Sequence, residues 1–340
     1  MHRKIKYGLV QFQWKILFLA RRELHLIGIL ASALIITLIT GVFVKSSHST
    51  APPRFSSLFI PRHECRSWKT TPQHKTTLIT KTACERDYFL LILVSTAPAH
   101  LERRNLIRET WGTDNNQTAP QWKTYFVIAQ TENQTLSDLV NAENKNYSDL
   151  IRGNYLENYW NQSLKIQMAF EWAARYCMFS FLLKTDDDVL VMTKDLIQFL
   201  QRKPTPKQGL FMGALHHNPK VRREGKWNVA YEEYKYTYYP DFCSGAGFVM
   251  SYDVVECLVP LFDVIKPYRM DDVYIGMLAQ EAGVIPVHHS GFYMPIDNYD
   301  DCNFVPNTLV QHRATGQCLL KLLRMHAKRL SYYRNLGSFF

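Results

Sequence analysis

The chain has 340 residues and a formal net charge of +10, and 46% of its residues are hydrophobic. The positive charge lies at the two ends, since residues 1–22 hold six Lys or Arg, residues 321–340 hold five, and neither segment holds an acid. The section between them is nearly neutral, which argues against the broad basic surface of a nucleic-acid-binding protein. It is also long enough to form one large hydrophobic core.

An apolar stretch without Asp, Glu, Lys or Arg, residues 26–44, follows the basic N-terminus. At about 1.5 Å per residue it just spans a hydrocarbon core of about 30 Å. A cleaved signal peptide usually has a shorter apolar core and a small-residue cleavage pattern, which residues 26–44 do not match. Because the basic residues precede the stretch, we predict a cytoplasmic tail over 1–25 and a transmembrane signal-anchor over 26–44. A luminal stem over 45–85 and a luminal domain over 86–340 then follow.

Two further features fit exposure to the lumen of the secretory pathway. Four N-x-S/T sequons begin at Asn116, Asn133, Asn146 and Asn161, which we predict to be glycosylated. All seven cysteines lie beyond the predicted anchor, where disulfides form. The odd number leaves at least one cysteine without a partner in the chain, and the spacing leaves the pairing open.

Strand-like and helix-like segments alternate through the luminal domain, which predicts an α/β fold with a mostly parallel central sheet. The predicted strands are residues 88–95, 122–129, 179–184 and 209–215. The predicted helices are residues 101–111, 163–176 and 195–201, with another after residue 271 and a basic amphipathic helix at the C-terminus.

Three consecutive carboxylates, Asp186, Asp187 and Asp188, stand between two apolar runs. A solvated acidic turn is one interpretation. Like charges at the end of a buried strand repel one another, however, and a hard cation relieves that repulsion. Oxygen ligands at a sheet edge suit Mn²⁺ or Mg²⁺, which bridge to a substrate diphosphate. We therefore predict a metal–diphosphate site here.

The helix after the first strand carries Arg104 and Arg108 on one face, at i and i+4. Ligands of open α/β sheets bind beyond the carboxyl ends of the strands, where such a pair can receive a phosphate or a nucleotide. A solvated basic face is the alternative.

Two later segments carry further candidates. Gly245 and Gly247 precede an apolar run and allow close approach of backbone to a ligand, or a bulge. Asp271 and Asp272 stand at the start of a predicted helix, where acids also act as simple caps. We nevertheless take Asp272 as the candidate general base.

Four motifs occur in order: residues 103–112, FLLKTDDDVLV, YYPDFCSGAGFVMS and RMDDVYIGM. Together they resemble the animal β1,3-glycosyltransferase family of the Golgi, which contains β1,3-galactosyltransferases and β1,3-N-acetylglucosaminyltransferases. The resemblance covers about residues 88–312. It implies a GT-A-type nucleotide-sugar-binding fold, a UDP-sugar donor, Mn²⁺ with Mg²⁺ as the alternative, and inversion at the anomeric carbon. It also implies a glycoprotein or glycolipid acceptor and a single-pass type II protein of the Golgi membrane.

The resemblance assigns roles to individual residues. Asp188 would ligate the metal directly, and Asp186 would hold the donor ribose and complete the metal site. Asp187, Gly245, Gly247, Arg104 and Arg108 would line the donor site. Asp272 would be the catalytic base, with Asp271 beside it. His312 would be a late metal ligand, although the family usually has Val-His and in this chain Gln311 stands between Val310 and His312.

The motifs give conflicting indications about the donor. The Cys-Ser-Gly-Ala-Gly segment resembles galactose-transferring members, whereas the Met-Asp-Asp-Val segment resembles N-acetylglucosamine-transferring ones. We predict transfer of galactose from UDP-galactose to the 3-hydroxyl of a glycan, with UDP-N-acetylglucosamine as the alternative donor. A catalytically inactive glycan-binding scaffold is the non-enzymatic alternative, and a phosphatase or nuclease built on the Asp triplet is a third.

Overall fold

The computed structural model describes residues 77–295 and 302–337 of the chain, and side chains as far as residue 329. The predicted tail 1–25, the predicted anchor 26–44 and the stem up to residue 76 lie outside the described residues. Among the residues that are described, no helix is both long and apolar enough to cross a bilayer. These residues all belong to one compact unit.

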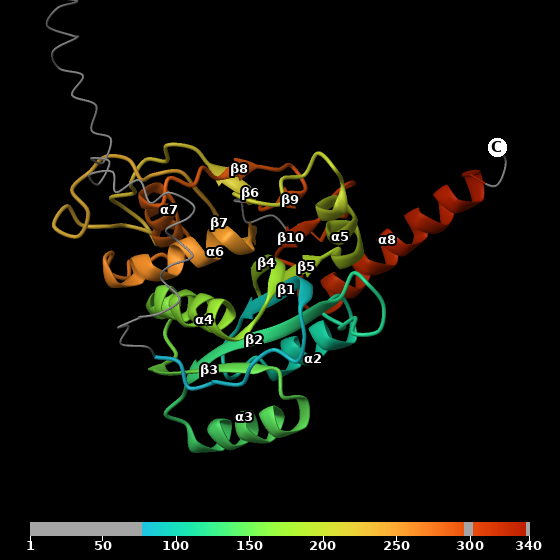
Figure 1. Cartoon of the computed structure of the whole chain (residues 1–340), viewed down its shortest axis with the longest axis horizontal. Helices are drawn as coiled ribbons and strands as arrows, with labels where there is room; N and C mark the ends of the chain where they lie inside the picture. The colour runs from blue at the N-terminus through green and yellow to red at the C-terminus, as the bar shows by residue number, and fades with distance from the viewer. Residues whose placement is uncertain (1–76, 296–301, 338–340) are drawn as a thin grey trace, which may run out of the picture. The chain divides into compact units, whose positions relative to one another are not determined.

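A seven-stranded sheet with the order β3-β2-β1-β4-β7-β6-β8 forms the centre of this unit (Figure 1). Its strands are β1 (Tyr88–Ser95), β2 (Trp122–Gln130), β3 (Leu150–Leu156), β4 (Phe179–Asp186), β6 (Phe211–His216), β7 (Phe242–Ser251) and β8 (Val287–His288). Only β7 runs antiparallel to its neighbours, and all the other pairs are parallel. The predicted α/β fold with a mostly parallel central sheet is confirmed.

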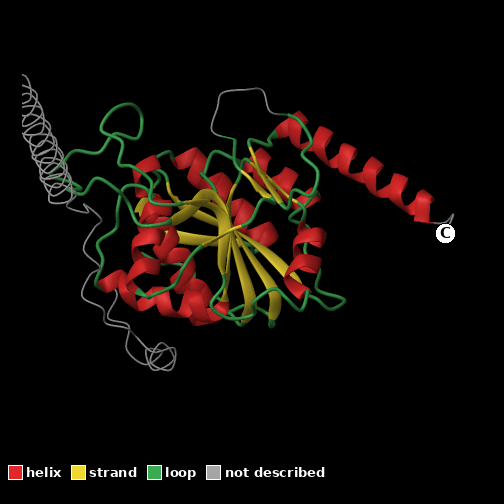
Figure 2. Ribbon diagram, turned by 90° about the horizontal axis from the view of Figure 1, so that it is seen from above, coloured by secondary structure: helices red, strands yellow, loops and turns green. Residues whose placement is uncertain are grey.

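Helices cover both faces of this sheet, as Figure 2 shows. Along β1, Leu91 and Leu93 point into one hydrophobic core and Leu90, Ile92 and Val94 into the other, as the two-residue period of a strand requires. The first core includes residues of α4 (Gln162–Tyr176), α6 (Tyr252–Leu258) and α7 (Asp271–Glu281). The second includes residues of α2 (Leu101–Glu109), α3 (Gln134–Tyr147), α5 (Thr193–Gln201) and α8 (Gly316–Gly337). Burial on both faces explains why β1 is a continuous apolar run.

Strand register brings distant segments to one edge of the sheet. Thr185 near the end of β4 pairs with Gly247 of the antiparallel β7, so the first residues of β7 extend past the carboxyl end of β4. A second sheet, with the order β5-β10-β9, contains β5 (Val189–Val191), β9 (Phe292–Tyr293) and β10 (Val310–His312). There His312 pairs with Val189, which places it next to Asp188. The remaining elements are the short helices η2 (Tyr159–Asn161) and η3 (Val259–Asp263).

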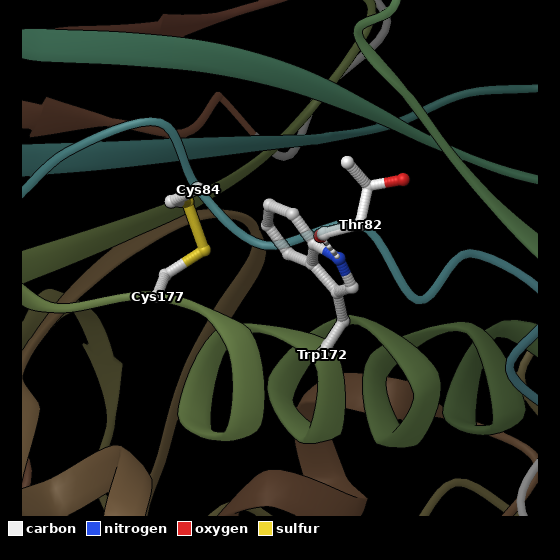
Figure 3. The surroundings of a disulfide bond; sticks show 4 residues. All are labelled: Thr82, Cys84, Trp172 and Cys177. Atoms are coloured by element: carbon white, nitrogen blue, oxygen red, sulfur yellow. Dashed lines mark hydrogen bonds between the residues drawn. A yellow bond between two sulfur atoms is a disulfide. The ribbon is translucent and has the colours of Figure 1, made fainter.

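The last residues of the predicted stem pack against the domain (Figure 3). Cys84 forms a disulfide with Cys177 at the end of α4, and the indole nitrogen of Trp172 donates a hydrogen bond to the carbonyl oxygen of Thr82 at 3.0 Å. Leu78 is buried and bridges to Gly153 on β3. Residues 77–85 are therefore part of the folded domain rather than of a free tether.

The cysteines agree with an oxidising environment. A second disulfide joins Cys302 and Cys318, and Cys257 is also disulfide-bonded. Cys243 is buried in β7 with a free thiol, and burial raises the pKa of that thiol to about 12. A thiol that stays protonated inside a core is chemically inert.

Candidate active site

A cavity of 1340 Å³ lies at the edge of the sheet where β1 and β4 end. Its lining comes from segments far apart in the sequence: residues 95–97, 186–188, 219–222, 244–246, 269–273 and 312–313, together with side chains of α2 and η2. All three residues of the Asp triplet and both acids of α7 line it. The structure therefore brings together the two acidic motifs that the sequence singled out separately.

The three aspartates have different environments. Asp187 is buried, and its carboxylate accepts hydrogen bonds from Thr96 Oγ1 at 2.6 Å and Arg103 Nη1 at 2.7 Å, while His100 Nδ1 lies 2.6 Å away. These partners use both carboxylate oxygens. Asp187 therefore holds the segment after β1 and the start of α2 against the end of β4.

Asp188 faces His312 across the cavity edge, with 3.5 Å between Asp188 Oδ2 and His312 Nε2. Burial alone would raise the pKa of Asp188, but the hydrogen bond and charge of His312, with help from Arg103, bring that pKa below its usual value. The other oxygen, Oδ1, is buried and has no hydrogen-bond partner. An orphaned carboxylate oxygen of this kind is costly unless a cation or water completes it.

The predicted metal site fits this donor set in part. Within residues 77–295 and 302–337, no three His, Cys, Asp or Glu side chains are grouped closely enough to hold a metal ion by themselves. Asp188 and His312 offer two donors, and Asp186 has one oxygen engaged by Lys184 at 2.9 Å. Because Mg²⁺-like ions are held by one or two carboxylates plus substrate phosphates, a diphosphate would have to complete the coordination shell.

A buried lysine connects the two acidic motifs. Lys184 Nζ contacts Asp186 Oδ1 at 2.9 Å, Asp271 Oδ2 at 3.0 Å and the carbonyl oxygen of Gly245 at 2.5 Å. Its side chain is 2% exposed. Burial alone would lower the pKa of Lys184, but the two carboxylates raise it above its usual value. Lys184 is therefore a charged link between β4, β7 and the start of α7.

The candidate base Asp272 is held by backbone rather than by a cation. Asp272 Oδ1 accepts a hydrogen bond from the backbone N–H of Val273 at 2.8 Å. Burial and the adjacent Asp271 carboxylate raise the pKa of Asp272 to about 7. Burial, opposed by Lys184 but assisted by Asp271 and Asp188, similarly raises the pKa of Asp186 to about 6. A carboxylate with a pKa near neutrality is well suited to accept a proton from a hydroxyl group.

The structure corrects the roles expected of the two arginines. Arg104 is completely buried, and its guanidinium pairs with Glu143 of α3 at 2.7 Å. Arg108 pairs with the same Glu143 at 2.6 Å and with Asp149 at 2.8 Å. Neither lines the cavity. Their face of α2 contacts α3 and the segment just before β3, so they stabilise the fold, and the expected contact with a donor does not fit their positions.

The two glycines also differ from each other. A Cβ on Gly245 would lie 3.2 Å from Asp271 Oδ1, so this glycine gives the α7 carboxylates space at the cavity wall. A Cβ on Gly247 would lie 2.8 Å from Val310 Cγ1. Gly247 is absent from the cavity lining. It allows β7 and β10 to pack closely and is not positioned to contact a donor.

Comparison with known proteins identifies the family. The family model described as Galactosyltransferase matches residues 102–290, more than half of the chain. The chain belongs to the galactosyltransferase family. The predicted resemblance to β1,3-glycosyltransferases is therefore confirmed.

Two curated relatives of this galactosyltransferase-family chain are each 32% identical to it. Lactosylceramide 1,3-N-acetyl-beta-D-glucosaminyltransferase of Xenopus tropicalis matches over 249 residues, 69% of this chain and 65% of the relative. Beta-1,3-galactosyltransferase 1 of Homo sapiens matches over 213 residues, 62% of this chain and 65% of the relative. The chain thus spans about two thirds of the length of both. Among solved structures, the galactosyltransferase LgtC shares 13% identity over 66% of this chain and 87% of its own, with a TM-score of 0.36.

Three residues of the site in this galactosyltransferase-family chain were not identified by the sequence analysis. Lys184 stands two residues before Asp186 on the same strand, so both side chains point to one face of the sheet. A lysine within an otherwise apolar strand was the signal in the sequence that could have identified it. His100 and Arg103 are three residues apart, which placed them on one helical face. No signal in the sequence showed that their face, rather than that of Arg104, meets the cavity.

The four sequons lie outside the cavity lining. Asn133 caps α3 by accepting a hydrogen bond from the backbone N–H of Leu136 at 3.1 Å, and Asn146 lies on the same helix. Both are exposed, whereas Asn116 and Asn161 are partly buried. Glycosylation of these sites stays a prediction.

Proposed function

We propose that the chain is an inverting, metal-dependent β1,3-glycosyltransferase that transfers galactose from UDP-galactose to the 3-hydroxyl of a glycan acceptor. One observation carries this proposal: a single cavity holds both Asp188 and His312, whose side chains lie 3.5 Å apart, and a separate carboxylate, Asp272, with a pKa of about 7. A glycosyl transfer without a protein nucleophile needs both, because one group must stabilise the leaving diphosphate and another must activate the acceptor. In keeping with the N-terminal sequence, we propose that the protein is a Golgi membrane protein anchored by residues 26–44. Its luminal catalytic domain would comprise the predicted domain from residue 86 together with residues 77–85, which pack against it.

The chain's own residues divide the work in this proposal. Asp188 and His312, with Asp186, would hold a Mn²⁺ ion, which as a Lewis acid would neutralise negative charge on the diphosphate. Asp187 fixes the turn that presents Asp188, and Lys184 keeps Asp186 and Asp271 in place. Asp272 accepts the proton from the acceptor hydroxyl as that oxygen attacks the anomeric carbon from the side opposite UDP.

UDP-N-acetylglucosamine is the second candidate donor. The Xenopus relative is named as an N-acetylglucosaminyltransferase and the human relative as a galactosyltransferase, at the same 32% identity. The full-length chain, expressed through a secretory pathway and solubilised in detergent, should be assayed with each donor, Mn²⁺ and a panel of glycan acceptors. We expect transfer from UDP-galactose that EDTA abolishes. Transfer from UDP-N-acetylglucosamine alone would support the second candidate, and hydrolysis of simple phosphoesters without sugar transfer would contradict both.

Metal binding should depend on the donor diphosphate. Because the protein offers so few donor groups, we expect the Kd for Mn²⁺ to fall by at least about tenfold when UDP is present, a difference of about 1.4 kcal/mol. Titration calorimetry of the full-length chain with and without UDP measures this directly and needs no turnover. Asp188→Asn should remove the effect, whereas Asp138→Asn on the exposed side of α3 should leave it intact. Equal Mn²⁺ affinity in both titrations would contradict a shared site.

A further inference from the structure

Three aromatic side chains form a cluster beside the cavity. Tyr159 and Trp160 belong to η2, and Trp227 belongs to the loop between β6 and β7. The ring centroids of Tyr159 and Trp227 are 5.6 Å apart, and Trp160 lies 5.0 Å from Tyr159. Tyr159 is 46% exposed and Trp160 is 39% exposed. Large apolar rings gathered at such exposure indicate a binding surface rather than a core.

The cluster is held in place by cations from neighbouring segments. Arg269, just before α7, stacks on Trp160 with its guanidinium carbon 4.0 Å from the ring centroid, and it also donates to the carbonyl oxygen of Asn228 at 3.1 Å. The loop that carries Trp227 is closed on itself by Arg223, which donates to three of its carbonyl oxygens at 2.8–2.9 Å. A binding surface fixed in this way loses little entropy when a ligand arrives.

The cluster lies on the side of the cavity where the candidate base stands. Tyr159 and Trp227 both line the cavity, as do Asp271 and Asp272. Arg269, whose guanidinium stacks on Trp160 at 4.0 Å, stands two residues before Asp271 in the chain, so the cluster adjoins the start of α7. A molecule resting on Tyr159 is therefore close to the group that would take its proton.

A cation lies near both of the cavity-lining rings. Lys226 Nζ lies 5.0 Å from the ring centroid of Tyr159 and 4.7 Å from that of Trp227. The negative face of an aromatic ring attracts such a cation, and it attracts partially positive C–H groups in the same way. One face of a pyranose ring carries mainly C–H groups, while its hydroxyl groups project outward. A sugar stacked on these rings would keep its hydroxyls free for hydrogen bonding.

We propose that Tyr159 and Trp227 form the acceptor subsite, where they stack against the C–H face of the acceptor's pyranose ring and direct its 3-hydroxyl toward Asp272. This inference rests on the proposed glycosyl transfer and names which part of the cavity selects the acceptor. It assigns Trp160 and Arg269 a supporting role, since they position Tyr159 and the loop of Trp227. The nucleotide occupies the other side of the cavity, near Asp188 and His312.

The test compares substitutions in the full-length enzyme at saturating donor and Mn²⁺, with methyl β-galactoside and methyl β-N-acetylglucosaminide as acceptors. Trp227→Ala and Tyr159→Ala should each raise the acceptor KM by about tenfold, the effect of losing one stacking contact of about 1.4 kcal/mol. Trp227→Phe should restore most of that loss, and the Kd for UDP should not change in any of these variants. Leu139→Ala is the control, because Leu139 is an exposed apolar residue of α3 and lies outside the cavity lining.

The other outcomes distinguish failure of the acceptor subsite from failure of the proposed function. An unchanged acceptor KM in Trp227→Ala, with transfer intact, would overturn the acceptor subsite and leave the proposed function standing. A tenfold weaker Kd for UDP would also overturn it, since the rings would then bind the nucleotide. If the native chain transferred no sugar, the proposed function would fail by itself. Saturation-transfer NMR of the same glycosides with the native chain and Trp227→Ala would still decide whether the rings bind a pyranose.

Discussion

Replacing Asp272 with asparagine is expected to lower kcat by about 10²–10⁴-fold, the usual contribution of a positioned general base. In the native chain, kcat/KM should fall as the pH drops below about 7, because burial and Asp271 raise the pKa of Asp272 to about 7 and the protonated acid cannot accept a proton. Steady-state assays from pH 5 to 9 measure both effects. Asp138→Asn serves as the control, since Asp138 lies on the outer side of α3.

The same substitution should make the protein more stable at neutral pH. A carboxyl group whose pKa is higher in the folded than in the unfolded state destabilises the fold once it is ionised. That cost is absent below the unfolded pKa of about 3.9 and is complete above about pH 7. Thermal unfolding should therefore give Asp272→Asn a higher Tm than the native chain at pH 8 and an equal one near pH 4. Loss of activity with a lower Tm at pH 8 would instead indicate that Asp272 is structural.

Replacing Lys184 with methionine is the second substitution with a large expected effect. The ammonium group is buried between Asp186 and Asp271, and its removal leaves both carboxylates without their shared counter-charge. Breaking a buried ion pair from one side costs about 3–5 kcal/mol. We expect a loss of that size in the free energy of unfolding at pH 7.5, together with loss of activity. Chemical denaturation followed by tryptophan fluorescence measures the first.

The cause of this instability can be tested by removing a carboxylate as well. Lys184→Met with Asp271→Asn should recover part of the lost stability, because one uncompensated charge disappears. Lys123→Met is the matched control, since Lys123 pairs with Asp114 at 2.6 Å at a more exposed site outside the cavity. That change should cost no more than about 1 kcal/mol. Equal losses in the two lysine variants would show that packing, and not the buried charge, accounts for the effect.

The elements that were predicted most accurately are those whose hydrophobic pattern lies within a single segment of the chain. β1 is a continuous apolar run, and the predicted positions of β1 and β4 agree with the structure to within two residues. α3 was missed because its sequence is mostly polar and only Val140 is buried among its apolar residues. β7 was not predicted as a strand. It includes Gly245 and Gly247, because its pairing with β4 and β6 outweighs the low strand preference of glycine.

Site residues that belong to one local acidic motif were predicted from the sequence. Site residues that depend on contact between two distant elements could not be predicted from local patterns. Spacing placed Arg104 and Arg108 on one face of α2 correctly. The direction of that face depends on Glu143, which lies on another helix and is out of reach of any local pattern. His312 approaches Asp188 only because β10 pairs with β5 in one particular register. Such meetings are set by tertiary packing, so the contributions of Lys184, Arg103 and Trp227 became apparent only in three dimensions.

The disulfide between Cys84 and Cys177 closes a covalent ring around a large part of the domain. The cysteines are 93 residues apart, and the ring includes α2, α3, α4 and three strands of the seven-stranded central sheet, β1, β2 and β3. A protease that cuts an exposed turn inside this ring cannot separate the two pieces while the disulfide is intact. The chain would therefore survive limited cleavage as a single molecule, and would come apart only when cleavage and reduction occurred together.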